Sequence, residues 1–241
     1  MNLLVITSII VLTMCFLLIC YLNYNDLQET FKQRNLSAIV ISLKRRPNRL
    51  EKFYENYDLG VECITKEAVD GTTLDKDLLL QNGTIDENTT TLLPSDGAIG
   101  CYISHYEVWK NVKEGEVLIV FEDDAYSEKR GQITIESLNE RISDLPRDWH
   151  IYVIGHPHSV LKTHRVPDTM AERIEEFCGT HAYVINYSGA TTLIDYNAMF
   201  PIDKQIDGKM SEMSKMNLLN MYLHKDLPMY ASGNGEPSDI Q

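Results

Sequence analysis

The stretch Val117–Ala125 reads VLIVFEDDA and decides the fold of this chain. It starts with an apolar, partly β-branched run that is typical of a buried strand. Three acids, Glu122, Asp123 and Asp124, follow that run without a break. In an open α/β sheet, ligands collect at the carboxyl ends of the strands. The stretch therefore predicts an α/β fold whose ligand site lies where this strand ends.

The three adjacent carboxylates point to a bound cation. They repel one another, and each raises the pKa of its neighbours unless a cation lies among them. A hard divalent ion such as Mn²⁺ or Mg²⁺ prefers carboxylate oxygens and would in turn hold an anionic ligand such as a diphosphate. The alternative is an acidic turn without a metal, since the whole chain carries a net charge of −13.

Short apolar runs alternate with helical stretches along the chain. Strands are expected at residues 38–43, 61–65, 116–121, 150–154 and 182–185, and helices at 47–57, 94–113, 133–142 and 188–196. This alternation predicts a mainly parallel sheet flanked by helices. Residues 72–94 are polar and contain an Asn-Gly pair, so an exposed loop with one short helix is expected there.

The N-terminus predicts a membrane anchor. Leu3–Leu22 form twenty uncharged, predominantly apolar positions, which is about the length that spans a bilayer. No small-residue cleavage site follows them, so we expect an uncleaved, single-pass transmembrane helix at 1–23, a stem at 24–36 and one α/β domain at 37–241. Lys32 and Arg34 follow the span and no basic residue precedes it, which by the positive-inside rule favours a cytosolic domain.

One basic run, Lys44–Arg49, stands out against the acidic background. Arg45, Arg46 and Arg49 follow the first predicted strand, where they would neutralise ligand phosphates through bidentate contacts or form solvated surface charge. Both interpretations stay open. The acidic balance argues against nucleic acid as a partner, because phosphate contacts along a nucleic acid need clustered Lys and Arg.

The cysteines do not predict a disulfide framework. The chain has 5, too few and too scattered for one. Cys63, Cys101 and Cys178 of the predicted domain are interpreted as small buried hydrophobic residues, because no CxxC or Cys/His ligand spacing is found.

The helix expected at 94–113 has two different faces. One face carries an apolar stripe of Ile99, Tyr102, Ile103, Tyr106 and Trp109, typical of a core contact. The opposite face is small and polar and carries Gly97, Cys101, Ser104 and His105. Such a face indicates close approach to a ligand or to another backbone, and tight packing against the sheet is the alternative.

Several segments, taken in order, resemble one known family. They are Ile39–Arg49 (IVISLKRRPNR), Gly97–Trp109 (GAIGCYISHYEVW), the EDD triplet, Gly179–Ile185 (GTHAYVI) with Ser188–Ala190, Pro201–Asp203 (PID) and Ser238–Ile240 (SDI). This set resembles glycosyltransferase family 25, and the resemblance runs from about Ser37 to the C-terminus. It implies a GT-A-like fold, a nucleotide-sugar donor and a divalent metal, Mn²⁺ or Mg²⁺, at the EDD segment.

The resemblance implies a reaction and roles for particular residues. The expected activity is metal-assisted, inverting transfer of a sugar, with galactose favoured, from a UDP-sugar to a hydroxyl of a glycan or protein acceptor. It also favours a lumenal domain, against the positive-inside rule. The expected metal ligands are Glu122, Asp124 and His181. The expected donor contacts are Arg45, Arg46, Arg49, Ser104, His105, Asp123 and Asp239. The candidate base is Asp203, with Asp207 and Asp239 as alternatives.

Two other function classes are weighed against this one. A catalytically silent member of the same fold would act as a carbohydrate-binding or scaffolding module, and the intact EDD triplet and Asp203 argue against it. A metal-dependent phosphohydrolase would need more dispersed acids and His ligands than the chain carries. Ser104 and His105 do not form a hydrolase pair, because adjacent residues on a helix do not face each other.

Overall fold

The computed structural model describes residues 13–14, 36–127, 131, 133–155, 162–225 and 230–232. The chain divides into two units, Met1–Arg34 and Asn35–Gln241. Of the first unit only Thr13 and Met14 are described, and both are helical. No helix among the described residues is both long and apolar enough to cross a bilayer. The predicted anchor at 3–22 lies almost wholly outside these residues and stays a prediction.

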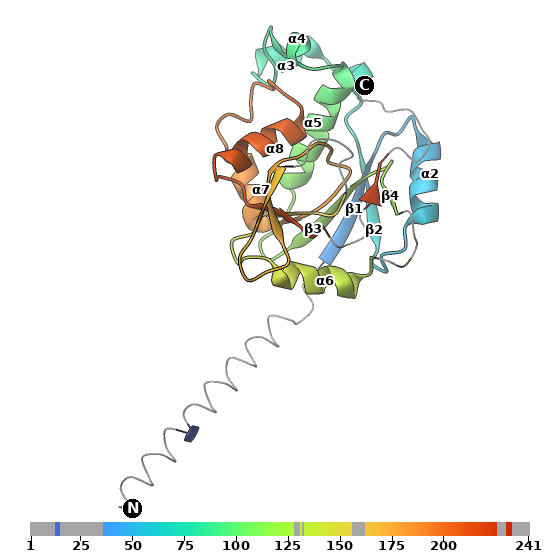
Figure 1. Ribbon diagram of the computed structural model, residues 1–241. Helices are drawn as coiled ribbons and strands as arrows, with labels where there is room; N and C mark the ends of the chain where they lie inside the picture. The colour runs from blue at the N-terminus through green and yellow to red at the C-terminus, as the bar shows by residue number, and fades with distance from the viewer. Residues whose placement is uncertain are drawn as a thin grey trace, which may run out of the picture. The chain divides into compact units, whose positions relative to one another are not determined.

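The second unit is built on one eight-stranded sheet (Figure 1). Its strands are β1 Leu36–Ser42, β2 Cys63–Glu67, β3 Val117–Glu122, β5 Ile151–Val153, β6 Lys162–Arg165, β7 Glu172–Glu176, β8 Ala182–Asn186 and β9 Met221–Leu223. They lie in the order β2-β1-β3-β8-β5-β9-β7-β6. The pairings give six strands one common direction, and β7 and β8 run against them.

Helices cover both faces of this sheet. The helices are α2 Pro47–Asn56, α3 Lys76–Gln81, α4 Thr89–Leu92, α5 Asp96–Trp109, α6 Ile135–Asp144, α7 Tyr187–Ile194 and α8 Ile206–Lys215, with a short 3₁₀ turn, η1, at Gly71–Thr73. One apolar core joins α5, α7 and α8 to the sheet, and a second core joins α2 and α6 to the opposite face. Along β3, Leu118 and Val120 enter the first core, whereas Val117, Ile119 and Phe121 enter the second.

The structure confirms the predicted class of fold, a large sheet flanked by helices. Every strand and helix expected from the sequence is present within a few residues of its predicted bounds. The elements that the sequence did not predict are β6, β7, α8 and β9, together with a small second sheet of β4 Tyr126–Ser127 and β10 Tyr230–Ala231. β6 (KTHR) and β7 (ERIEE) are largely charged, so they lack the apolar run or alternation that indicates a strand.

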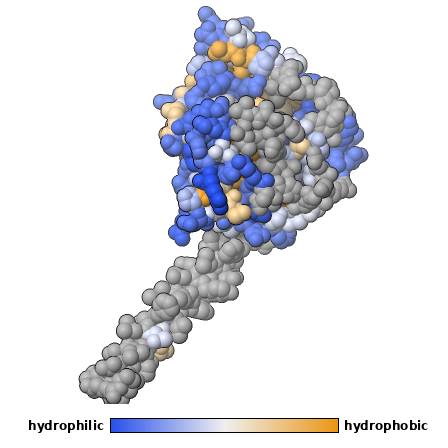
Figure 2. Space-filling view, in the orientation of Figure 1, coloured by the Kyte–Doolittle hydropathy of each residue, from blue (hydrophilic) through white to orange (hydrophobic). Residues whose placement is uncertain are grey.

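The segment predicted as an exposed loop contains η1, α3 and α4 and lies at the surface. Leu78, Leu80 and Leu92 are exposed there. Leu78 and Leu80 belong to α3 and Leu92 to α4, and Figure 2 shows an apolar patch in this part of the view, at the top. The loop prediction was therefore right about exposure but underestimated the helical content.

The small face of α5 permits a close approach between this helix and the loop after β2. A Cβ atom on Gly100 would lie 2.5 Å from the carbonyl oxygen of Val69 and 2.9 Å from the nitrogen of Gly71. A Cβ atom on Gly71 would lie 2.2 Å from the carbonyl oxygen of Asp96. Ser104 links the two backbones by hydrogen bonds, because its hydroxyl donates to the Gly100 carbonyl and accepts from the Val69 N–H. The face is small because two backbones meet on it.

We expect Gly100→Ala to destabilise the protein by about 1–3 kcal/mol, because the new methyl group cannot fit against the Val69 backbone. Gly208→Ala is the matched control. It also lies in a helix, but the nearest atoms to its new Cβ belong to the Lys204 side chain at 3.7 Å. The control should keep or raise the thermal midpoint. Equal midpoints for the two variants, measured by circular dichroism, would contradict this account of the small face.

Candidate active site

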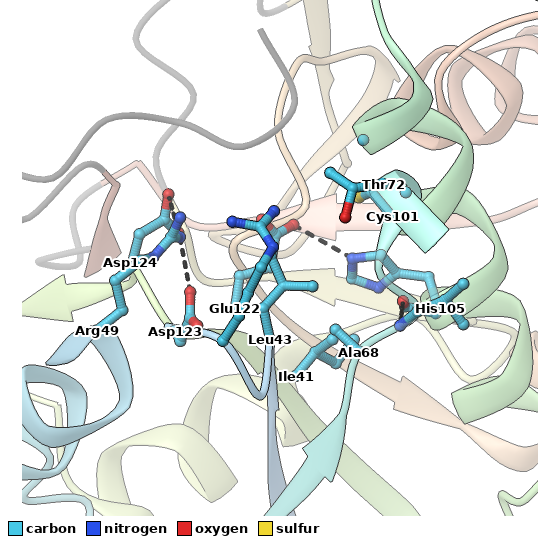
Figure 3. A pocket seen from close by; sticks show the side chains of 15 residues that line it. Ile41, Leu43, Arg49, Ala68, Thr72, Cys101, His105, Glu122, Asp123 and Asp124 are labelled. Atoms are coloured by element: carbon cyan, nitrogen blue, oxygen red, sulfur yellow. Dashed lines mark hydrogen bonds and ion pairs between the residues drawn. The ribbon is translucent and has the colours of Figure 1, made fainter. Parts of the chain in front are cut away.

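A pocket lies where β1, β2 and β3 end, against the small face of α5 (Figure 3). It encloses about 650 Å³ of atom-free space, part of which is open solvent. Its walls come from the segments that follow the three strands, from α2 and from α5; the predicted site residues among them are Arg45, Arg49, Ser104, His105, Glu122, Asp123 and Asp124. The site is therefore at the carboxyl end of the strands, as the sequence predicts.

Strand alternation separates the first two acids of the triplet. Successive side chains of a strand point to opposite faces. Glu122 continues the row of Leu118 and Val120 toward α5, and Asp123 continues the opposite row toward α2. The ladder holds this register, because the Glu122 N–H donates to the His181 carbonyl and the Asp123 N–H donates to the Ile41 carbonyl.

Asp123 is engaged by protein groups on both of its oxygens. The Arg49 Nη2 atom lies 2.6 Å from Oδ1, and the Ser42 hydroxyl donates to Oδ2 at 2.7 Å. Both charged side chains are buried, with exposed fractions of 8% for Arg49 and 7% for Asp123. The same Arg49 atom lies 3.3 Å from Asp124 Oδ2. Asp123 is thus bound to structural partners, which leaves Glu122 and Asp124 as the acids suited to a cation.

Glu122 is held by a buried chain of hydrogen bonds. Its Oε1 atom accepts from the Thr180 hydroxyl at 2.6 Å and lies 3.2 Å from His105 Nε2. The His105 Nδ1 atom lies 2.9 Å from the Tyr183 hydroxyl, which accepts from the Trp109 indole N–H at 2.8 Å. If Tyr183 donates to Nδ1, then Nε2 carries the proton and donates to Glu122. His105 therefore orients Glu122.

The pKa values of Glu122 and Asp124 are shifted in opposite directions. Burial alone would raise the pKa of Glu122, but the hydrogen bonds and charges around it, led by His105, outweigh burial and lower that pKa. Burial, followed by the charge of Glu122, raises the pKa of Asp124 from 3.8 to about 7. Asp124 Oδ1 is buried without a hydrogen-bond partner in the described part of the chain. A divalent cation would supply both the partner and the charge, so these residues fit a metal ion.

This shift predicts how the metal-free protein responds to pH. Folded Asp124 keeps its proton to a higher pH than the unfolded chain does, so its contribution to stability is lost as pH rises from about 4 through about 7. Asp124→Asn removes this contribution. We therefore expect the difference in thermal midpoint, wild type minus variant, to fall over that interval in chelator-treated protein. A constant difference across the interval would show that Asp124 titrates normally.

The other basic and polar residues predicted for the site lie in different surroundings. Arg45 lines the pocket, and its Nε atom lies 2.7 Å from Asp70 Oδ2. Arg46 is the N-cap residue of α2 and is not among the pocket residues. Ser104 lines the pocket, but its hydroxyl is hydrogen-bonded to the backbone of Gly100 and Val69.

The structure does not bring His181, Asp203 or Asp207 into the pocket lining. The His181 Nε2 atom lies 3.0 Å from the Tyr230 carbonyl oxygen in a buried setting. Asp203 pairs with the buried Lys209 at 2.7 Å, and Asp207 accepts from the Gly179 N–H at 2.7 Å. Both aspartates thus have protein partners outside the pocket lining, and the assignment of either as the base stays a prediction. Asp239 lies outside the described residues.

Four residues of the hydrogen-bond networks around the acids were not predicted as site residues. They are Ser42, Trp109, Thr180 and Tyr183. Trp109 and Tyr183 read as ordinary core residues in the sequence, and only their polar atoms distinguish them. Thr180 is the middle residue of the GTH segment, and its place in that motif was the signal in the sequence that could have identified it as a site residue.

Comparison with known proteins decides the family. The model of glycosyltransferase family 25, described as "LPS biosynthesis protein", matches residues 35–210, which include β1, α5, the EDD triplet and the GTH segment. The chain belongs to glycosyltransferase family 25. Ser238–Ile240 fall outside the matched range.

Individual family 25 relatives match the chain at low identity. Procollagen galactosyltransferase 2 of Homo sapiens is 28% identical over 208 residues, 80% of this chain and 33% of that protein. The probable inactive glycosyltransferase 25 family member 3 of Rattus norvegicus is 28% identical over 188 residues, 69% of this chain and 32% of that protein. The glycosyltransferase 25 family member of Drosophila melanogaster is 30% identical over 202 residues, 76% of this chain and 31% of that protein.

This family 25 chain spans about a third of the length of the curated relatives it matches. Among solved structures, mouse xyloside xylosyltransferase 1 in its apo form matches with a TM-score of 0.45 and 8% identity, over 84% of this chain and 86% of that chain.

Proposed function

We propose that this chain transfers a sugar, with galactose favoured, from a UDP-sugar to a hydroxyl of a glycan or protein acceptor, with Mn²⁺ or Mg²⁺ as cofactor. The observation that carries the proposal is the pair Glu122 and Asp124, two partly buried carboxylates at a strand end that line an open pocket. Support also comes from family membership and from relatives named galactosyltransferases.

The residues present suit the chemistry of the donor. Glu122 and Asp124 would hold the metal ion, which when bound neutralises the charge that develops on a diphosphate leaving group. His105 and Thr180 keep Glu122 ionised and oriented. Arg49 keeps Asp123 and Asp124 in place from the α2 side. Arg45 is the pocket's exposed guanidinium and would contact a donor phosphate if it left Asp70.

The proposal also includes a GT-A-like fold, inversion at the anomeric carbon and a lumenal, membrane-anchored setting. The GT-A-like assignment is supported by the mixed sheet and by the position of the pocket at its strand ends. Inversion at the anomeric carbon and a lumenal, membrane-anchored setting rest on the resemblance and on the sequence at 3–22.

A panel of UDP-sugars, with and without Mn²⁺, tests the proposal. Donor binding is measured by calorimetry and donor cleavage by release of UDP, on the full-length protein. UDP-galactose should bind and be cleaved only with the metal present. Metal-dependent binding without cleavage of any donor, with or without acceptor, would favour the catalytically silent alternative, for which some relatives named inactive give a reason. Absence of any nucleotide-sugar binding would refute the proposal.

A further inference from the structure

The pocket contains a second group of metal-ligating atoms, which shares Glu122 with the pair Glu122 and Asp124. The Cys101 Sγ atom, a His105 ring nitrogen and a Glu122 carboxylate oxygen all lie within 4.8 Å of one another. Cys101 and His105 stand at positions i and i+4 of α5, so they share one face of the helix. Glu122 meets that face from the end of β3 (Figure 3).

We propose that Cys101, His105 and Glu122 form a site for Zn²⁺, and that Zn²⁺ bound there inhibits the enzyme by taking Glu122 from the catalytic metal. Thiolate, imidazole and carboxylate are the three common zinc ligands in proteins. A thiolate also selects Zn²⁺ over Mn²⁺ and Mg²⁺, which prefer oxygen ligands only. The inhibition rests on the proposed function, but the zinc site itself does not.

The surroundings of the three residues favour such a site. All three line the same pocket, so an ion has a path from solvent. One thiolate and one carboxylate balance the two charges of Zn²⁺, which keeps this partly buried group neutral. Three protein ligands leave the fourth position of a tetrahedral ion for water. His105 already has its other ring nitrogen held by Tyr183, as metal-bound histidines do.

Protons must rearrange when the ion binds. The thiol proton of Cys101 leaves to solvent as the sulfur bonds to Zn²⁺. The proton on His105 Nε2 is lost from that nitrogen and one is gained at Nδ1, so that Nδ1–H donates to the Tyr183 oxygen and the Tyr183 hydroxyl hydrogen turns away from His105. The hydrogen bond between His105 and Glu122 is lost, and the ion replaces it. Zn²⁺ therefore changes the orientation of Glu122 and competes with the catalytic metal for its carboxylate.

Spectroscopy with Co²⁺ as the probe tests the zinc site on the full-length protein. Wild type should show a thiolate-to-cobalt charge-transfer band that added Zn²⁺ abolishes. Cys101→Ser should lose the band and bind Zn²⁺ at least about tenfold more weakly. Cys178→Ser is the matched control, because Cys178 is exposed and outside the group, and it should keep the band. No band in wild type, or an undiminished band in Cys101→Ser, would overturn the site.

A second measurement needs no variant. Zn²⁺ should slow alkylation of Cys101 by iodoacetamide and leave that of Cys178 unchanged, as read by mass spectrometry. Equal alkylation of Cys101 with and without Zn²⁺ would also overturn the site, even if Cys101→Ser failed to fold.

The inhibition is tested separately. At fixed Mn²⁺, rising Zn²⁺ should lower the rate of donor cleavage by wild type at least about tenfold, and excess Mn²⁺ should restore it. A rate that Zn²⁺ leaves unchanged, in protein that binds it at Cys101, would refute the inhibition. Protein that binds Zn²⁺ at Cys101 but cleaves no donor with Mn²⁺ would instead refute the proposed function and leave the site standing.

Discussion

Asp124→Asn is expected to lower Mn²⁺-dependent donor cleavage by about 10²–10³-fold at saturating metal. The substitution keeps the shape of the side chain but removes the negative charge that the metal ion would bind. Asp124 has the attributes of a metal ligand, because its Oδ1 atom is buried without a hydrogen-bond partner among the described residues and its pKa is raised by burial and by Glu122. The measurements are initial rates over a range of Mn²⁺ concentrations and the affinity for Mn²⁺ by calorimetry.

The fold should not suffer from this change. Asparagine removes a carboxylate whose charge is unfavourable in the metal-free protein, so the thermal midpoint at neutral pH should be equal or higher. Asp195→Asn is the matched control, because Asp195 is an exposed aspartate at the end of α7, and its rate should equal that of wild type. Asp124→Asn with a wild-type rate and wild-type Mn²⁺ affinity would remove Asp124 from the metal site.

Arg49→Met is expected to cause the largest loss of stability. Methionine keeps much of the apolar stem but leaves Asp123 buried without the guanidinium 2.6 Å away. Removing one partner of a buried ion pair costs about 3–5 kcal/mol, which for a domain of this size lowers the thermal midpoint by about 6–20 °C. The midpoint is measured by calorimetry in chelator-treated protein at neutral pH.

Lys44→Met controls for the loss of one positive charge in the same basic run. Lys44 is exposed, so its midpoint should change by no more than about 2 °C. The pair also separates two roles for Arg49. If Arg49 serves the donor phosphates and not the fold, Arg49→Met will keep the midpoint of wild type and lose affinity for UDP, which would overturn the structural assignment of this ion pair.

Much of the fold was predictable from local pattern. The apolar run at 117–121 predicted β3, and the helix at 94–113 was evident from its aromatic stripe. The reversed direction of β7 and β8 was not predictable, because strand direction depends on the path of the connections and not on the strand's own residues. The charged strands β6 and β7 gain their pairing from neighbours in the sheet, which no local pattern records.

Part of the candidate site was likewise predictable from the sequence, and part was not. The position of the EDD triplet at a strand end predicted the pocket, and the small face of α5 was expected to meet a ligand or a backbone. The structure shows the contact with a backbone, that of the loop after β2, and places the same face along the pocket. Asp203 was the candidate base because of its motif, and the fold pairs it with Lys209. The position of a residue in the chain does not reveal which distant side chain it pairs with in the fold.

By itself, the sequence determined that a buried strand delivers three acids to one edge of an α/β sheet, because apolar runs and alternating periods are local properties. Only the tertiary structure decided what each acid does. Sheet order puts α2 with Arg49 on the Asp123 side and α5 with His105 on the Glu122 side. It also brings Tyr183 of β8 to His105, and completes the group of Cys101 and His105 with Glu122. Partners from distant segments meet through packing and register, and neither is set by neighbouring residues in the chain.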